Sequence, residues 1–135
     1  MDLDRCDFDG ACHCGAVRFR VRLAQGLHTA RRCNCSYCRM RGAVIVTARL
    51  ADLEVTQGAQ HLGVYRFGTH VAAHHFCRIC GIATHQRRRS DPTQFGVNVA
   101  CLGLSPFDFP ELPVNESANW EKGGVAGYLS YRAAE

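Results

Sequence analysis

Gly10-Ala-Cys-His-Cys-Gly-Ala-Val-Arg-Phe19 combines a C-x-C cysteine pair, closed by a glycine, with the start of an alternating pattern. Two sulfurs at this spacing can reach one metal ion. From residue 16 to residue 23 apolar side chains alternate with arginines, which predicts a half-buried strand. Its arginine face is expected to be solvated rather than to bind a ligand. Its apolar face consists of Val17, Phe19, Val21 and Leu23.

A second cysteine pair lies in Phe76-Cys-Arg-Ile-Cys-Gly81 and has the spacing of a metal-binding turn. Two sulfurs of a C-x-x-C turn reach one tetrahedral ion, and a following glycine readily closes the turn. Four thiolates complete a structural zinc site, so this pair needs another. Because loop-closure entropy grows slowly with length, the 62 residues between the two pairs are no obstacle. We predict a structural zinc on Cys12, Cys14, Cys77 and Cys80.

The middle cluster, Arg32-Cys-Asn-Cys-Ser-Tyr-Cys-Arg39, contains three cysteines. They are too many to share the first site and one too few to close a site of their own. Three protein ligands with an open fourth position are typical of catalytic zinc. We therefore predict a second zinc, catalytic in role, on Cys33, Cys35 and Cys38.

Two alternatives would close that second site. Cys6 or Cys101 could supply the fourth ligand, although both are expected to be ordinary core or surface thiols. A histidine could also supply the fourth ligand. As a separate matter, no histidine stands out as a general base for the reaction. His74 and His75 precede a cysteine on a predicted strand, so at most one of them faces the metal sites. The candidate ligands are His13, His28, His61, His70, His74, His75 and His85.

The cellular context is inferred from the cysteines and the N-terminus. Nine cysteines without a secretory signal in residues 1–5 favour metal or catalysis over disulfides, and predict a cytoplasmic protein. The sequence does not fit a zinc deaminase, because no His-x-Glu or Cys-x-Glu occurs and Phe76 stands where a proline is expected. No apolar stretch approaches the roughly 20 residues that span a bilayer, so no membrane association is expected.

The formal charge of +4 describes the metal-free chain. Seven thiolates remove seven charges and two zinc ions return four, which leaves about +1 when both sites are filled. Nucleic-acid-binding domains are usually strongly basic, so no nucleic-acid partner is expected. The run Arg87–Ser90 is expected to be a solvated loop, with an anionic ligand such as a carboxylate as the alternative.

The remaining patterns predict one mainly β domain of 135 residues with little helix. A helical turn is expected at 36–41, and beyond residue 104 the proline-rich and asparagine-rich chain predicts an extended surface segment. The metal sites should lie at strand ends or in loops. The further strand candidates are 43–48, 53–57, 62–67, 72–76, 82–86 and 95–99.

The three cysteine motifs together resemble the family of glutathione-dependent formaldehyde-activating enzymes, whose domain also occurs in centromere protein V. The resemblance covers about residues 8–105, with 106–135 as a C-terminal extension. It implies a β-tent fold of small antiparallel sheets. It also implies the same division into a four-cysteine structural zinc and a three-cysteine catalytic zinc.

The resemblance implies a carbon–sulfur lyase that joins glutathione, or a similar thiol, to formaldehyde or another small aldehyde. The expected cofactors are two Zn²⁺ per chain, with glutathione as co-substrate. Many relatives carry a histidine before a C-terminal tryptophan, whereas this chain has Val114-Asn-Glu-Ser-Ala-Asn-Trp120. A thiol carrier or sensor and a zinc-stabilised interaction module are the alternatives. Exposed edge strands leave a homodimer open.

Overall fold

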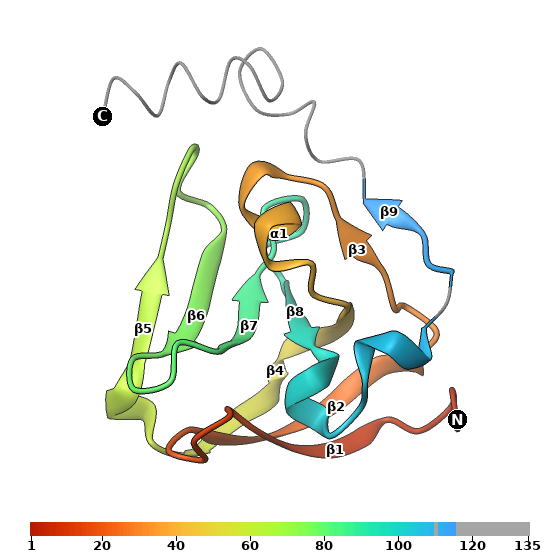
Figure 1. Cartoon of the computed structure of the whole chain (residues 1–135), viewed down its shortest axis with the longest axis horizontal. Helices are drawn as coiled ribbons and strands as arrows, with labels where there is room; N and C mark the ends of the chain where they lie inside the picture. The colour runs from red at the N-terminus through yellow and green to blue at the C-terminus, as the bar shows by residue number, and fades with distance from the viewer. Residues whose placement is uncertain (110, 116–135) are drawn as a thin grey trace.

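A seven-stranded antiparallel sheet dominates the computed structural model, which describes residues 1–109 and 111–115. This confirms the mainly β class with little helix. Figure 1 shows the strands at one end of the sheet crossing those at the other. The strands, in their spatial order, are β1 (Asp7–Ala11), β2 (Arg18–Leu27), β4 (Ile45–Gln57), β8 (Gln94–Asn98), β7 (Ala83–Arg87), β6 (Ala73–Cys77) and β5 (Leu62–Tyr65).

The smaller elements surround this sheet. The expected helical turn is α1 (Ser36–Arg41), and the three 3₁₀ turns are η1 (Ala59–His61), η2 (Val99–Leu102) and η3 (Pro106–Asp108). Strands β3 (Arg32–Cys33) and β9 (Val114–Asn115) form a parallel pair, although only antiparallel sheets were expected. Two residues are too few to show an alternating pattern, so the sequence could not reveal this pair. None of the described helices is long and apolar enough to span a membrane.

The strands predicted at 43–48 and 53–57 are parts of the single strand β4. The gap between the two predicted strands coincides with an irregularity in β4. There the pairing of β2 with β4 shifts register, since Leu23 lies opposite Ala48 and Val21 lies opposite Leu53. Such an irregularity bends the strand and increases its twist. Thus β4 pairs with β8 at its start and with β2 mostly further along.

The order of the strands brings two distant turns together. After β4 the chain crosses to the far edge of the sheet at β5 and returns through β6 and β7 to β8, which pairs with β4. The β1–β2 turn and the β6–β7 turn consequently lie at the same end of the molecule (Figure 1). Both turns contain a cysteine pair.

The main core lies against β2, β4 and β8. On β2, the predicted apolar side chains Phe19, Val21 and Leu23 are buried, whereas the three arginines are exposed, as expected. Two of those arginines pair with aspartates of β1, in the pairs Arg20–Asp9 and Arg22–Asp7. The core is completed by residues of β4, β8 and η2, including Val46, Ala48, Val97, Val99 and Leu102.

Phe19 occupies a position that depends on a glycine of the neighbouring strand. It lies opposite Gly10 on β1, and a Cβ atom at position 10 would overlap the Phe19 ring. The Phe19 ring therefore occupies the space that a side chain at position 10 would fill. By covering Gly10, the ring also stabilises a glycine on an edge strand.

The expectation of an extended surface segment beyond residue 104 is only partly correct. Phe109 is buried and belongs to the main core, and Leu112 packs against it. The patterns of proline and asparagine indicate turns but not which apolar residue folds back onto the sheet. The stretch 116–135, including Trp120, lies outside the described residues.

Phe19→Ala should destabilise the zinc-loaded protein by about 3–5 kcal/mol, because it removes a buried aromatic ring and leaves both a cavity and an uncovered Gly10. Arg20→Ala, on the exposed face of the same strand, should change stability by less than about 1 kcal/mol. Urea unfolding at fixed zinc concentration measures both. Equal midpoints for the two variants would contradict this account of the core.

Candidate metal centres

The cysteines of the β1–β2 turn and of the β6–β7 turn come together in one cluster. The Sγ atoms of Cys12, Cys14, Cys77 and Cys80 all lie within 4.8 Å of one another. The Cys12–Cys14 sulfur distance is 3.7 Å, and the distance from Cys14 to Cys77, 63 positions along the chain, is 3.8 Å. The pairs that were matched by ligand counting are therefore adjacent in space.

The two turns are built alike. In the first, the backbone N–H of Cys12 donates to Val17 and that of Gly15 donates back to Cys12. In the second, Cys77 donates to Ile82 and Gly81 donates back to Cys77. Both glycines have φ near +80°, at 77° and 81°, a conformation that glycine adopts without a steric cost. The glycine after each cysteine pair thus closes the turn that presents the sulfurs.

Backbone N–H groups point at the sulfurs of this cluster. Val17 N lies 3.3 Å from Cys12 Sγ and Ile79 N lies 3.4 Å from Cys77 Sγ. Hydrogen bonds from the backbone of Cys14 and Ile82 lower the pKa of Cys80 to about 6. Such donors stabilise a thiolate, which is the form that binds zinc.

The measured separations match the geometry of zinc. A tetrahedral ion with Zn–S bonds of about 2.3 Å places its sulfurs about 3.8 Å apart. The two sulfur distances given above agree with that value to within 0.1 Å. This donor set could therefore hold a zinc ion.

The three-cysteine cluster is built on and around α1. Cys33 ends β3, Cys35 is the N-cap of α1, and Cys38 lies in its first turn. The Cys35 sulfur accepts a hydrogen bond from the backbone N–H of Cys38, at 3.3 Å. The Sγ atoms of the three cysteines lie within 4.8 Å of one another.

No other histidine, cysteine or carboxylate among residues 1–109 and 111–115 joins this cluster. Cys6 lies near the backbone oxygen of Asp4, and Cys101 is buried beside that of Ala83. Burial raises the pKa of Cys101 to about 12, as expected of an ordinary core thiol. Within the described residues, the cluster therefore has three sulfurs and no fourth protein ligand.

The crowding of these sulfurs favours a cation among them. Contacts with Cys33 and Cys38, together with burial, raise the pKa of Cys35. Contacts with Cys33 and burial likewise contribute to the raised pKa of Cys38. Three neighbouring thiolates repel one another unless a metal ion neutralises them. The donor set fits a thiophilic divalent ion such as zinc.

A polar network that sequence analysis missed lies against Cys38. Gln86 on β7 is buried, and its side-chain oxygen lies within hydrogen-bond distance of Arg41 and of His74. Arg41 Nη2 also lies 3.6 Å from Cys38 Sγ. One related expectation came from the sequence, that at most one of His74 and His75 faces the metal sites.

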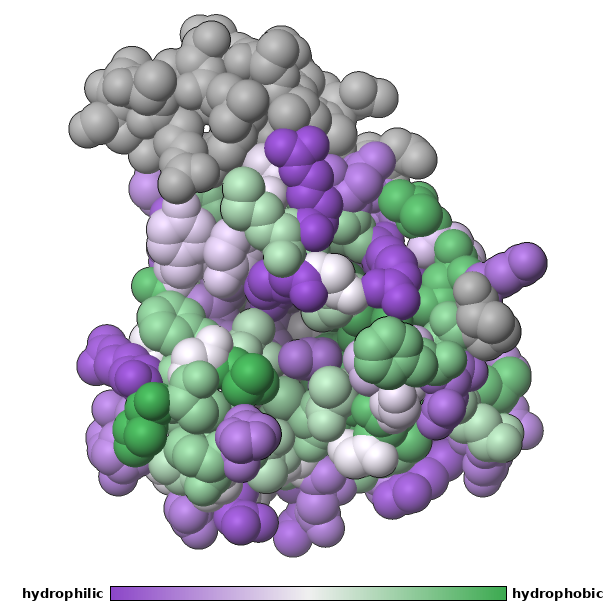
Figure 2. Space-filling view, viewed as in Figure 1, coloured by the Kyte–Doolittle hydropathy of each residue, from purple (hydrophilic) through white to green (hydrophobic). Residues whose placement is uncertain are grey.

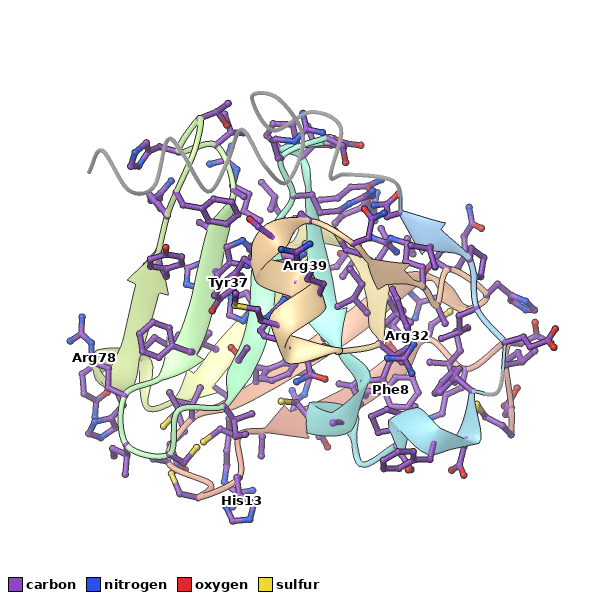
Figure 3. All side chains as sticks on the ribbon, turned by 45° about the horizontal axis from the view of Figure 1, so that its top comes forward. Phe8, His13, Arg32, Tyr37, Arg39 and Arg78 are labelled. Carbon is purple, nitrogen blue, oxygen red and sulfur yellow. The ribbon has the colours of Figure 1, made fainter. Side chains whose placement is uncertain are left out.

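The two adjacent histidines do face opposite sides of β6. His74 packs against Tyr37 of α1, with ring centroids 4.4 Å apart. His75 stacks on His85, also at 4.4 Å, away from the cluster. Burial lowers the pKa of His74 to about 4 and that of His85 to about 3, so both are neutral near pH 7. His13 is exposed and points away from the fold (Figure 3).

Two hollows flank α1. A small cavity of about 40 Å³ is bordered by the three cysteines, His74, Gln86 and the run 87–90. The arginines of that run are therefore placed beside the cluster, where Arg87 and Arg88 bond to Pro92, Gln94 and Ser90.

The opposite face of α1 borders a larger cleft of about 810 Å³. Tyr37, Met40 and Arg41 line it from the helix, and Tyr65, Phe76 and Ile82 line it from the sheet and the β6–β7 turn. Figure 2 shows apolar side chains on the surface near β5 and β6. This cleft has room for an organic molecule of moderate size.

Comparison with known proteins identifies a family for this arrangement. Residues 7–112 match the family described as glutathione-dependent formaldehyde-activating enzyme. A protein of Halomonas elongata, provisionally named a glutathione-dependent formaldehyde-activating enzyme, is 39% identical over 83 residues. That match covers 56% of this chain and 52% of the relative, so the matched region spans about half the length of this curated relative.

A solved structure shares the fold. The crystal structure of a Rhodobacter sphaeroides protein from a structural genomics programme superimposes with a TM-score of 0.77 at 56% sequence identity. The match covers 79% of this chain and 99% of the other.

Zinc analysis of the purified protein should find two ions per chain, and Cys35→Ser should retain one while keeping its circular dichroism spectrum. Cys77→Ser should lose its native spectrum, because zinc–thiolate binding of about 10–16 kcal/mol is comparable to the stability of a whole domain. Atomic emission spectroscopy gives the metal content. A parent protein with one zinc, or loss of both ions in Cys35→Ser, would contradict two independent sites.

Proposed function

Because the chain belongs to the family of glutathione-dependent formaldehyde-activating enzymes, we propose that it is a zinc-dependent carbon–sulfur lyase acting on a small thiol and a small aldehyde. The family description supports glutathione and formaldehyde as the pair. The product of the forward reaction, or the substrate of the reverse, is an S-hydroxyalkyl thiol such as S-(hydroxymethyl)glutathione.

The reaction is an addition without a change of overall oxidation state. The S–H group of the thiol adds across the aldehyde C=O: a carbon–sulfur bond forms, the C=O π bond breaks, and one proton is transferred from sulfur to oxygen. Cleavage reverses these changes. Neither direction needs an oxidant or reductant.

The different ligand counts of the two clusters carry the proposal. Four sulfurs on Cys12, Cys14, Cys77 and Cys80 suit a closed structural zinc. Three sulfurs on Cys33, Cys35 and Cys38, with no fourth ligand in the described part of the chain, suit a zinc that keeps a position for substrate. A purely structural domain would have no need of the second, incomplete cluster.

When bound there, a zinc ion would lower the pKa of a coordinated thiol and fix its orientation. The protein's own residues set the surroundings. Cys35 and Cys38 are buried, which strengthens electrostatic interactions at their sulfurs. Arg41 offsets the negative charge of the thiolates, and the cleft on the other face of α1 offers apolar walls from Tyr65 and Phe76.

None of the nine cysteines forms a disulfide, which suits a reducing compartment, so we propose that the enzyme works in the cytoplasm. The zinc-loaded chain carries little net charge, whereas nucleic-acid-binding domains are usually strongly basic, so we propose no nucleic-acid partner.

Glutathione should bind saturably to the zinc-loaded parent protein in calorimetry and should not bind to Cys35→Ser that retains only its first zinc. In the presence of ¹³C-formaldehyde, exchange NMR should then show faster interconversion of formaldehyde and the glutathione adduct than in a protein-free control. The acceleration should require the three-cysteine site, because only that site has a ligand position open to a thiol.

The outcomes separate the candidate functions. Binding without any acceleration would refute the lyase and support a thiol carrier. Absence of binding to every small thiol tested would overturn both and favour a zinc-stabilised interaction module. Cys6→Ser is the matched control, since Cys6 lies outside both clusters and should bind glutathione as the parent does.

A further inference from the structure

One side-chain oxygen next to the three-cysteine cluster has three neighbours. Gln86 Oε1 lies 2.5 Å from Arg41 Nη2, 3.1 Å from His74 Nδ1 and 3.8 Å from Cys38 Sγ. These groups come from β7, α1 and β6, so the oxygen connects three elements around the cluster. Gln86 itself is only 7% exposed.

The neighbours determine which protons are present. A guanidinium group only donates hydrogen bonds, so the atom of Gln86 that faces Arg41 must be the amide oxygen. An amide oxygen only accepts, and His74 Nδ1 must therefore carry the proton that it shares with Gln86. In the neutral imidazole this leaves Nε2 without a proton, as a hydrogen-bond acceptor.

That acceptor is buried and without a partner. His74 is 2% exposed, and its Nε2 has no hydrogen-bond partner among the described residues. Buried polar atoms are rarely left unpaired in folded proteins, and the exceptions often serve a function. His74 borders the same small cavity as Cys33, Cys35 and Cys38, so a molecule bound beside the sulfurs would lie next to the His74 side chain.

Arg41 has a second role in the network. Its Nη2 carries two N–H bonds, and it lies within reach of both Gln86 Oε1 and, at 3.6 Å, Cys38 Sγ. The guanidinium also lies 5.0 Å from the centre of the Tyr37 ring. Three thiolates around a divalent ion carry one net negative charge, and a guanidinium beside them offsets it.

A glycine on the neighbouring strand β8 leaves space beside the Gln86 side chain. Gln86 pairs with Gly96 on β8, where an added Cβ would lie 3.3 Å from Gln86 Cγ. Because Gly96 has no side chain, the Gln86 side chain can pass over position 96 towards the cluster. The glycine at position 96 therefore helps Gln86 to keep its place beside the cluster.

We propose that Gln86 is the positioning residue of the three-cysteine site: its oxygen holds Arg41 against Cys38 and fixes His74 in the tautomer whose Nε2 accepts a hydrogen bond. The inference rests on the proposed function only for the role of His74 Nε2. That atom would accept a hydrogen bond from the hydroxyl group of an S-hydroxyalkyl adduct. The network itself can be tested without any thiol or aldehyde.

The test compares Gln86→Met with Gln25→Met, an exposed glutamine on β2, in the zinc-loaded protein. The first readout is ¹⁵N NMR of the histidine rings, with His74 assigned by comparison with His74→Phe. The second is the competition of a chromophoric chelator for each zinc, in which the four-cysteine site serves as an internal reference.

Gln86→Met should lose the single Nδ1–H tautomer of His74 and should release the zinc of the three-cysteine site about 10–100-fold more readily, as is usual when a partner of a metal ligand is removed. The four-cysteine site and the Gln25→Met control should behave as in the parent. Retention of both the tautomer and the zinc affinity in Gln86→Met would overturn the inference.

A folding defect in Gln86→Met would shift the test to Arg41→Met, with Arg39→Met as its control. Arg39 is exposed on the same helix, and Figure 3 labels it. Weaker zinc retention in Arg41→Met alone would support the network, and equal retention in the two variants would overturn it. Failure of the parent to bind any of the small thiols tested would instead refute the proposed function and would not change these readouts.

Discussion

The convergence of four cysteine sulfurs joins the two ends of the seven-stranded sheet. Cys12 and Cys14 follow edge strand β1, whereas Cys77 ends β6, next to the opposite edge strand, and Cys80 lies in the turn that follows. Four strands of the sheet lie between β1 and β6, yet the Sγ atoms of Cys14 and Cys77 are 3.8 Å apart. A metal ion held there would link two turns that are 62 residues apart in the chain and would stabilise this arrangement of the sheet.

The three-cysteine cluster obeys a different constraint. Its sulfurs come from residues 33–38, so the chain needs only β3 and one helical turn to assemble them. Their environment, in contrast, is supplied by the distant strands β6 and β7 through His74 and Gln86. The incomplete cluster therefore acquires its polar neighbours and its cavity from the tertiary arrangement of the sheet, whereas Arg41 of α1 offsets its charge.

Much of this arrangement could be predicted from the sequence. Ligand counting paired Cys12 and Cys14 with Cys77 and Cys80, because zinc needs four donors and the chain offers two glycine-closed pairs. Alternation gave the buried and solvated faces of β2, and the helical turn at 36–41 has the observed bounds. The strand β1 and the burial of Phe109 were missed, since five residues rich in aspartate and glycine, and a phenylalanine between prolines, carry no strong periodic signal.

The sequence by itself determined which sulfurs could share an ion, because coordination number and turn geometry are local properties of each motif. Only the tertiary structure decided what surrounds them. Gln86 and Arg41 are 45 positions apart, and their contact with Cys38 depends on the register of β7 against β8 and on the space left at Gly96. A buried hydrogen-bond network of this kind requires precise relative placement of several elements, which no single segment of the chain encodes.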